Sequence, residues 1–162
     1  MDKPMVKPLH CGISIADMQE SIEWYNKMLG FELLFRKDID ILNCEIAFLK
    51  TGDFEIELFR HHNTLPLPPD RREPNKDIQT QGIKHICYEV EDITTLLNDL
   101  RAKGVDVVFG PIQMEGTLMG FIRDNTGNLI SMGLIPRGLP RFVIPAKAGI
   151  QEFKLDAGSS PA

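Results

Sequence analysis

Apolar and polar residues alternate along residues 9–15 and again along residues 83–90, a pattern that predicts two half-buried strands. Each strand precedes a segment in which apolar residues recur at helical spacing. In the first copy this segment is 18–29, and in the second it lies between Asp92 and Gly104. The hydrophobic pattern therefore repeats about 75 residues further along the chain.

Capping signals mark the ends of both predicted helices. Asp17 is a suitable N-cap for the first helix, and Glu20 follows three residues later, as in a capping box. Gly30 is placed to end this helix in a left-handed conformation. Asp92 and Gly104 take the corresponding places around the second helix, so the repeat includes the helix ends.

Three more strand-like runs complete each copy. They cover residues 31–36, 45–50, 54–60, 105–109, 118–123 and 128–134. Each half reads β-α-β-β-β. We predict an α+β fold built from two βαβββ modules at about residues 7–60 and 83–134.

Two segments fall outside the repeat. Residues 61–82 are polar and rich in proline, which predicts a long linker or lid, and Arg71 and Arg72 in it could contact an anionic substrate group or form a solvated pair. Residues 136–162 resemble a dispersed bacterial genomic repeat translated in frame. We expect an appendage without a role in the chemistry, following a domain at 1–135; the alternative is a segment that docks on the domain or on a dimer partner.

Bulk composition narrows the functional classes. A net charge of −5 gives no basic surface for nucleic acid, and no apolar run is long enough to span a membrane. The first residues lack the apolar centre of a signal peptide, so we expect a cytoplasmic protein. Three cysteines without C-x-x-C spacing predict small buried apolar side chains, with metal or redox chemistry as the alternative.

A histidine opens the first strand of each module. His10 lies 20 residues before Gly30, and His85 lies 19 residues before Gly104. Two imidazoles in equivalent positions can build a metal site, whereas either one alone could be an ordinary histidine of a sheet. We interpret the repetition as evidence for a shared site.

The last strand of the first module adds a carboxylate. Glu55 and Glu57 share one face of that strand, and we predict Glu57 as the third ligand with Glu55 as the fallback. Two histidines and one carboxylate suit a divalent first-row metal with positions open to water or substrate. Counting from the histidines equates Glu57 with Met132, but the alternation of apolar neighbours favours Ser131.

Several motifs carry a resemblance to a known family. They are Leu9-His10-Cys11-Gly12-Ile13-Ser14-Ile15-Ala16-Asp17, Ser21-Ile22-Glu23-Trp24-Tyr25-Asn26-Lys27-Met28-Leu29-Gly30-Phe31, Ile56-Glu57-Leu58-Phe59, Lys84-His85-Ile86-Cys87-Tyr88-Glu89-Val90-Glu91-Asp92 and Asp124-Asn125-Thr126-Gly127-Asn128-Leu129-Ile130. In order and spacing they resemble the vicinal oxygen chelate superfamily, which includes glyoxalase I, methylmalonyl-CoA epimerase, extradiol dioxygenases, and bleomycin and fosfomycin resistance proteins. The resemblance covers about residues 7–134.

The resemblance implies strands curled into an open cup around a metal, with helices outside. It maps the metal ligands to His10, Glu57 and His85, and it places Ser131 where metal-binding members carry a fourth ligand, a glutamate. It also implies a small-molecule substrate and a homodimer. Neutral serine is a poor ligand and no general base at pH 7, so Ser131 departs from the family pattern.

Three functions follow as hypotheses. The first is a glyoxalase-like, metal-dependent lyase or isomerase, acting through an enediolate-type intermediate on a small substrate with adjacent oxygens, with Glu57 moving a proton. Its metal would be zinc, nickel, cobalt, manganese or iron. The alternatives are a non-catalytic binding protein of the bleomycin-resistance type, which Ser131 favours, and a non-haem iron dioxygenase.

Overall fold

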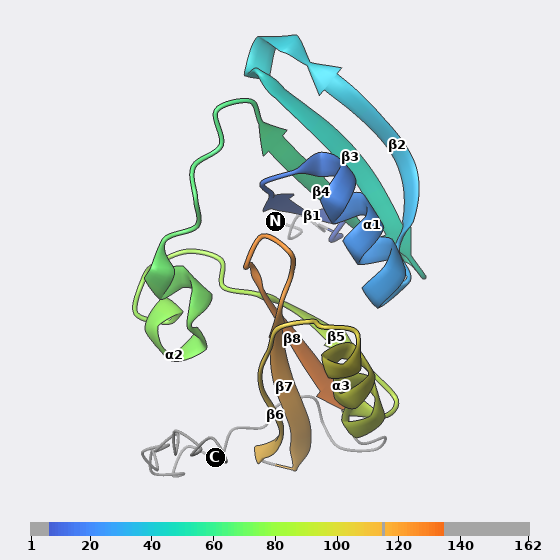
Figure 1. Cartoon of the computed structure of the whole chain (residues 1–162), viewed down its shortest axis with the longest axis vertical. Coiled ribbons are helices and arrows are strands. Elements are labelled where there is room, and N and C mark those ends of the chain that lie inside the picture. Colours follow the sequence, from blue (N-terminus) through green and yellow to red (C-terminus); the bar gives the residue numbers. More distant parts are fainter. Residues whose placement is uncertain (1–6, 115, 135–162) are drawn as a thin grey trace, which may run out of the picture.

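The computed structural model describes residues 7–114 and 116–134, and the predicted appendage lies outside them. The first module consists of β1 (His10–Ser14), α1 (Met18–Leu29), β2 (Glu32–Ile39), the short 3-10 helix η1 (Asp40–Leu42), β3 (Cys44–Thr51) and β4 (Phe54–His61). The second consists of β5 (Ile86–Glu89), α3 (Ile93–Ala102), β6 (Val107–Met114), β7 (Thr117–Arg123) and β8 (Leu129–Leu134). The prediction of two βαβββ modules is confirmed (Figure 1).

Each module forms its own four-stranded mixed sheet. The strand orders are β1-β4-β3-β2 and β5-β8-β7-β6, so the two sheets have the same topology. In each sheet the first strand runs parallel to the last strand of its module, and the remaining neighbours are antiparallel. This topology sets the histidine-bearing end of the module beside the predicted carboxylate strand.

The helices begin and end where the sequence signals indicate. The Asp17 side chain accepts a hydrogen bond from the backbone N–H of Glu20 (2.9 Å), and Asp92 accepts one from Thr95 (3.0 Å). Gly30 adopts a left-handed conformation with φ of 70° and donates its N–H to the last turn of α1. Both helices cover their sheets, and apolar side chains of the two modules form one buried core that includes Tyr25, Phe31 and Leu97.

The turn between β7 and β8 joins the second module to the first. Asp124 is buried and accepts a hydrogen bond from the Tyr25 hydroxyl of α1 (2.9 Å). The other carboxylate oxygen of Asp124 accepts hydrogen bonds from the backbone N–H groups of Thr126, Gly127 and Asn128 (2.8–2.9 Å), which closes the turn. The Asn128 amide then donates to the carbonyl of Ser14 (3.1 Å), so one turn bonds both to α1 and to the end of β1.

The segment between the modules is more ordered than a structureless linker. It contains η2 (Pro69–Arg72) and α2 (Pro74–Asp77), which lie beside the second module in Figure 1. The strand predicted at 83–90 is shorter in the structure, where it is β5. Just before β5, the Arg71 side chain donates a hydrogen bond to the carbonyl of Ile83 (2.7 Å), and the Lys84 side chain donates to carbonyls of the linker. Among the described residues, none of the helices is long and apolar enough to cross a membrane.

Candidate metal-binding site

His10 and Glu57 meet on the face of the first sheet that α1 leaves open. β1 and β4 are parallel neighbours, with Gly12 opposite Glu57 in the register. His10 and Gly12 lie two residues apart and share a face, so the Glu57 side chain points toward His10. The His10 Nε2 and Glu57 Oε2 atoms are 3.1 Å apart, and the two side chains are 30% and 14% exposed. The structure thus joins two of the three predicted ligands, at a position open to solvent.

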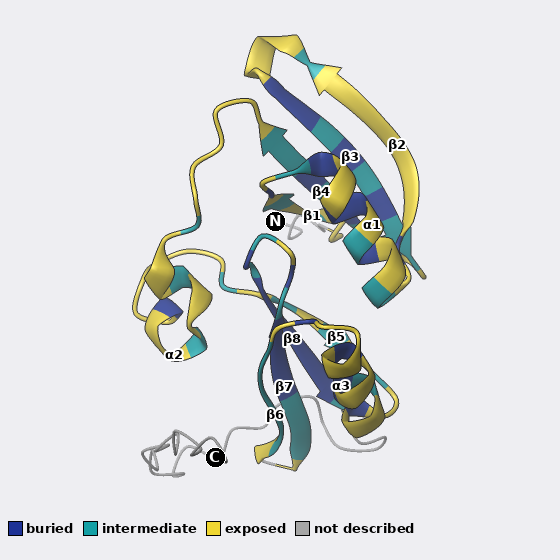
Figure 2. Ribbon diagram, in the orientation of Figure 1, coloured by how far each residue is buried: buried dark blue, intermediate teal, exposed yellow. Residues whose placement is uncertain are grey.

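Aromatic rings flank this pair. The edge of Phe48 packs against the His10 ring with 5.0 Å between ring centroids, and Phe35 stacks on Phe48 at 4.9 Å. Phe35 of β2 remains 49% exposed, and β2 is exposed along nearly its whole length (Figure 2). An apolar wall with a free surface therefore borders the histidine–carboxylate pair.

The second module repeats the arrangement without the carboxylate. Cys87 stands two residues after His85 and pairs with Ser131, as Gly12 stands two after His10 and pairs with Glu57. Ser131, rather than Met132, is therefore the residue in register with Glu57. It is 2% exposed and contributes a hydroxyl where its counterpart contributes a charge.

The aromatic wall also has a counterpart. The Phe121 ring lies edge-on to His85 with centroids 4.8 Å apart, and Phe109 lies 5.0 Å from Phe121. These phenylalanines are the site residues that the sequence reasoning missed. A signal was present, since Phe35 and Phe109 each follow their helix-ending glycine, Gly30 or Gly104, by five residues.

His85 lies apart from the other two predicted ligands in the single chain. Throughout the part of the chain that the structure describes, no three His, Cys, Asp or Glu side chains converge as a metal site would require. Partial burial of the His85 ring lowers its pKa, against the opposing effect of the Asp77 charge. A lowered pKa keeps this imidazole neutral near pH 7, the form that binds metals.

The fallback carboxylate is engaged elsewhere. Glu55 shares the face of Glu57, but its Oε1 lies 4.0 Å from the Lys50 ammonium of β3. Of the two carboxylates on this strand, only Glu57 lies against the histidine.

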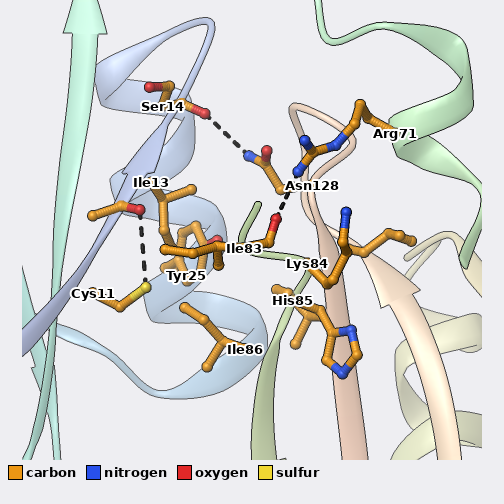
Figure 3. A pocket seen from close by; sticks show the side chains of 13 residues that line it. Cys11, Ile13, Ser14, Tyr25, Arg71, Ile83, Lys84, His85, Ile86 and Asn128 are labelled. Atoms are coloured by element: carbon orange, nitrogen blue, oxygen red, sulfur yellow. Dashed lines mark hydrogen bonds between the residues drawn. The ribbon is translucent and has the colours of Figure 1, made fainter. Parts of the chain in front are cut away.

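A pocket of about 200 Å³ opens between the two modules. Residues of β1, the start of β5, the start of β8 and the linker line it, among them Cys11, Ser14, Arg71, Lys84, His85 and Asn128. Figure 3 shows the hydrogen bond from Asn128 to Ser14 near its upper end, with the His85 ring directed away from both residues. Cys11, Cys44 and Cys87 are free thiols; of them only Cys44 is buried, so Cys11 and Cys87 do not fit the prediction of buried side chains.

Comparison with known proteins defines the class to which this paired-module fold belongs. The model of the Glyoxalase/Bleomycin resistance protein/Dioxygenase superfamily matches residues 7–132. The chain therefore belongs to this superfamily, and the resemblance inferred from its motifs is confirmed.

Curated relatives lie within the glyoxalase branch. The chain is 29% identical over 136 residues to lactoylglutathione lyase GLX1 of Arabidopsis thaliana, a match that covers 80% of this chain and 44% of the relative. It is 30% identical over 130 residues to a probable lactoylglutathione lyase of Synechocystis, covering 76% of this chain and 92% of the relative. The chain thus spans less than half of the Arabidopsis protein and nearly all of the Synechocystis one.

Solved structures share the fold. A glyoxalase family protein from Enterococcus faecalis superposes with a TM-score of 0.66 at 23% identity, over 78% of this chain and 96% of that one. The trypanothione-dependent glyoxalase I of Leishmania major gives a TM-score of 0.63 at 22% identity, over 80% and 87% of the two chains. The coarse assignment to a glyoxalase-like fold thus rests on both sequence and structure.

Proposed function

We propose that this protein is a metal-dependent lyase or isomerase of the glyoxalase type, acting on a small substrate that carries adjacent oxygens. The observation that carries the proposal is the His10–Glu57 pair, 3.1 Å apart on an open sheet face. Similarity to lactoylglutathione lyases supports the same reaction class. The names of these relatives specify lactoylglutathione, a thioester, and this compound or its precursor is the substrate to test first.

The donor atoms on this face fit a divalent first-row metal. An imidazole nitrogen and a carboxylate oxygen that already face one another need only a small separation to share an ion. His10 and Glu57 would hold the metal from the first module, and His85 would supply a second imidazole. When bound, the metal would act as a Lewis acid on the substrate's oxygens.

A second copy of the chain would bring His85 to the site. Within one chain His85 does not join His10 and Glu57, although it occupies the equivalent position of its own sheet. The first sheet leaves its aromatic wall and β2 exposed, and such a surface suits a protein partner (Figure 2). We therefore propose a homodimer in which each site combines the first module of one protomer with the second module of its partner.

Glu57 is the residue placed to move a proton. It is a carboxylate beside the site, its Oε2 lies 3.1 Å from the Nε2 of His10, and most of its side chain is buried. Ser131 cannot share the task, because a serine hydroxyl is neither charged nor basic near neutral pH. Glu57 would then both bind the metal and accept the substrate's proton.

A second candidate function rests on Ser131. A cup that retains His10 and His85 but lacks the second carboxylate could bind a small molecule without transforming it, as the bleomycin-resistance name in the family title suggests. Turnover distinguishes the two candidates, because a binding protein would take up ligand and leave it intact.

Metal content and turnover test the proposal together. We expect purified protein to bind a stoichiometric divalent ion and to turn over lactoylglutathione, with metal detected by atomic emission. Glu57→Gln should lose both properties. Glu55→Gln is the matched control, since it changes a neighbouring carboxylate on the same face that pairs with Lys50. Absence of metal binding after reconstitution would refute the proposal, whereas metal binding without turnover would select the binding protein.

A further inference from the structure

The linker carries a buried charge cluster that the proposed reaction does not use. Asp77 of α2 has a side chain that is only 2% exposed. The Nε of Arg71 lies 2.5 Å from its Oδ1, and the Nζ of Lys84 lies 3.5 Å from the same oxygen. Two cations therefore share one carboxylate, which leaves the cluster with one surplus positive charge.

Backbone oxygens hold both cations in place. Arg71 Nη2 donates to the carbonyl of Ile83 (2.7 Å), while Lys84 Nζ donates to the carbonyls of Asp77 (2.6 Å) and Thr80. The side chains of Arg71 and Lys84 are 29% and 23% exposed, so each is partly withdrawn from solvent. Because the cations are already ordered, an incoming anion would not have to restrict them, which favours binding.

The surplus positive charge of this cluster lies at the pocket between the two modules. Arg71 and Lys84 both line it, as does His85 next to Lys84 (Figure 3). Arg71 contacts Asp77 through Nε and Ile83 through Nη2, so these two contacts do not use its Nη1 group. Apolar side chains, including Ile13 and Ile86, line the same cavity. The pocket therefore offers a charged donor at one side and apolar walls at the other.

We propose that Arg71 and Lys84, held in place by Asp77, form a carboxylate-binding site that anchors the anionic end of the substrate beside His85. A surplus of one charge matches a carboxylate better than a doubly charged phosphate, and a guanidinium matches the planar shape of a carboxylate. The link to a substrate rests on the proposed function, but carboxylate binding by the pocket does not.

Butyrate is a suitable probe for carboxylate binding, and butyramide is an uncharged control of nearly the same shape. We expect NMR titration of the full chain to show butyrate binding and at least tenfold weaker binding of butyramide. Arg71→Gln should weaken butyrate binding at least tenfold. Arg72→Gln is the matched control and should leave it unchanged, because Arg72 is exposed, packs on Gly127 and does not line the pocket.

Asp77→Asn distinguishes ligand binding from a merely structural role. Removing the carboxylate charge raises the surplus from one positive charge to two. The backbone carbonyls of Ile83 and Asp77 still hold Arg71 and Lys84, so butyrate should bind more tightly, by about threefold or more. If the cluster served only to fasten the linker, Arg71→Gln and Asp77→Asn would weaken binding alike. That result, or equal affinity for butyrate and butyramide, would overturn the proposal; circular dichroism checks that both variants are folded.

Metal binding separates this inference from the proposed function. Arg71→Gln should retain the wild-type affinity for the metal, since Arg71 is not among the proposed ligands. Butyrate binding by a chain that binds no metal would refute the proposed function and leave the carboxylate site standing. Metal binding with turnover, but without butyrate binding, would refute the carboxylate site and leave the proposed function standing.

Discussion

At the scale of single residues, Ser131 is the position where the second module departs from the first at the proposed metal site. It occupies the register position of Glu57 and is almost fully buried beside Phe121. A glutamate there would add a charged oxygen ligand, so we expect Ser131→Glu to tighten metal binding by about tenfold or more. Isothermal titration with the metal measures the change. Ser131→Gln matches the size without the charge, and an equal gain with that variant would show that the effect is not ligation.

The hydroxyl groups of Tyr25 and Tyr88 allow a controlled test of how much the contact between the modules stabilises the fold. The Tyr25 hydroxyl donates to buried Asp124, whereas the buried hydroxyl of Tyr88 has no hydrogen-bond partner in the described structure. A bond to a charged group contributes about 1.5–3 kcal/mol, so Tyr25→Phe should lower the free energy of unfolding by about that amount. Tyr88→Phe should change it little or raise it. Urea denaturation measures both, and equal losses would contradict the assignment.

The same tyrosine gives a pH dependence with a definite sign. Burial, reinforced by the charge of Asp124, raises the pKa of Tyr25 well above its ordinary value of 10.0. Above pH 10 the unfolded chain therefore loses this proton while the folded chain keeps it, and the free energy of unfolding falls as pH rises. We expect the wild type to lose stability faster than Tyr25→Phe between pH 9 and pH 11. Parallel slopes for the two proteins would contradict this.

At the scale of elements, two glycines let the second sheet close tightly. Gly110 of β6 has a φ of 113°, and a Cβ atom there would lie 2.6 Å from the Cα of Gly120 in β7. Gly110→Ala should therefore cost about 2–4 kcal/mol, through backbone strain and overpacking together. Gly52→Ala is the control, since its φ is 55° and a Cβ there meets open space. Its cost should be about 1 kcal/mol. Thermal melts compare the two variants, and similar melting temperatures would contradict the packing argument.

The elements themselves were predictable because each obeys a local rule. Alternation placed the strands, and Asp17, Gly30 and Asp92 placed the helix ends, since caps act within one turn. The start of β5 and the short helices of the linker could not be predicted in this way. They depend on Arg71 and Lys84 reaching backbone oxygens several residues away, and the hydrophobic pattern does not encode such contacts.

At the scale of the whole molecule, the limit of sequence reasoning lies in the relation between the two sheets. The pairing of His10 with Glu57 was predictable, because β1 and β4 belong to one repeated module. The separation of His85 was not, because it depends on how the Asp124 turn and α1 set one module against the other. A repeat identifies equivalent positions, but it does not say whether they meet within one chain or across two.

A mixing experiment resolves that question. If each site takes His10 and Glu57 from one protomer and His85 from its partner, then His10→Ala and His85→Ala chains should each be inactive alone. A mixed dimer of the two would carry both substitutions in one site and none in the other. Random exchange after unfolding and refolding together should thus restore about a quarter of the wild-type sites. Metal stoichiometry and lactoylglutathione turnover should both recover to that level, and size-exclusion chromatography should show a dimer. If His85 served the site of its own chain, every site in every mixture would lack one ligand, and no recovery would be seen.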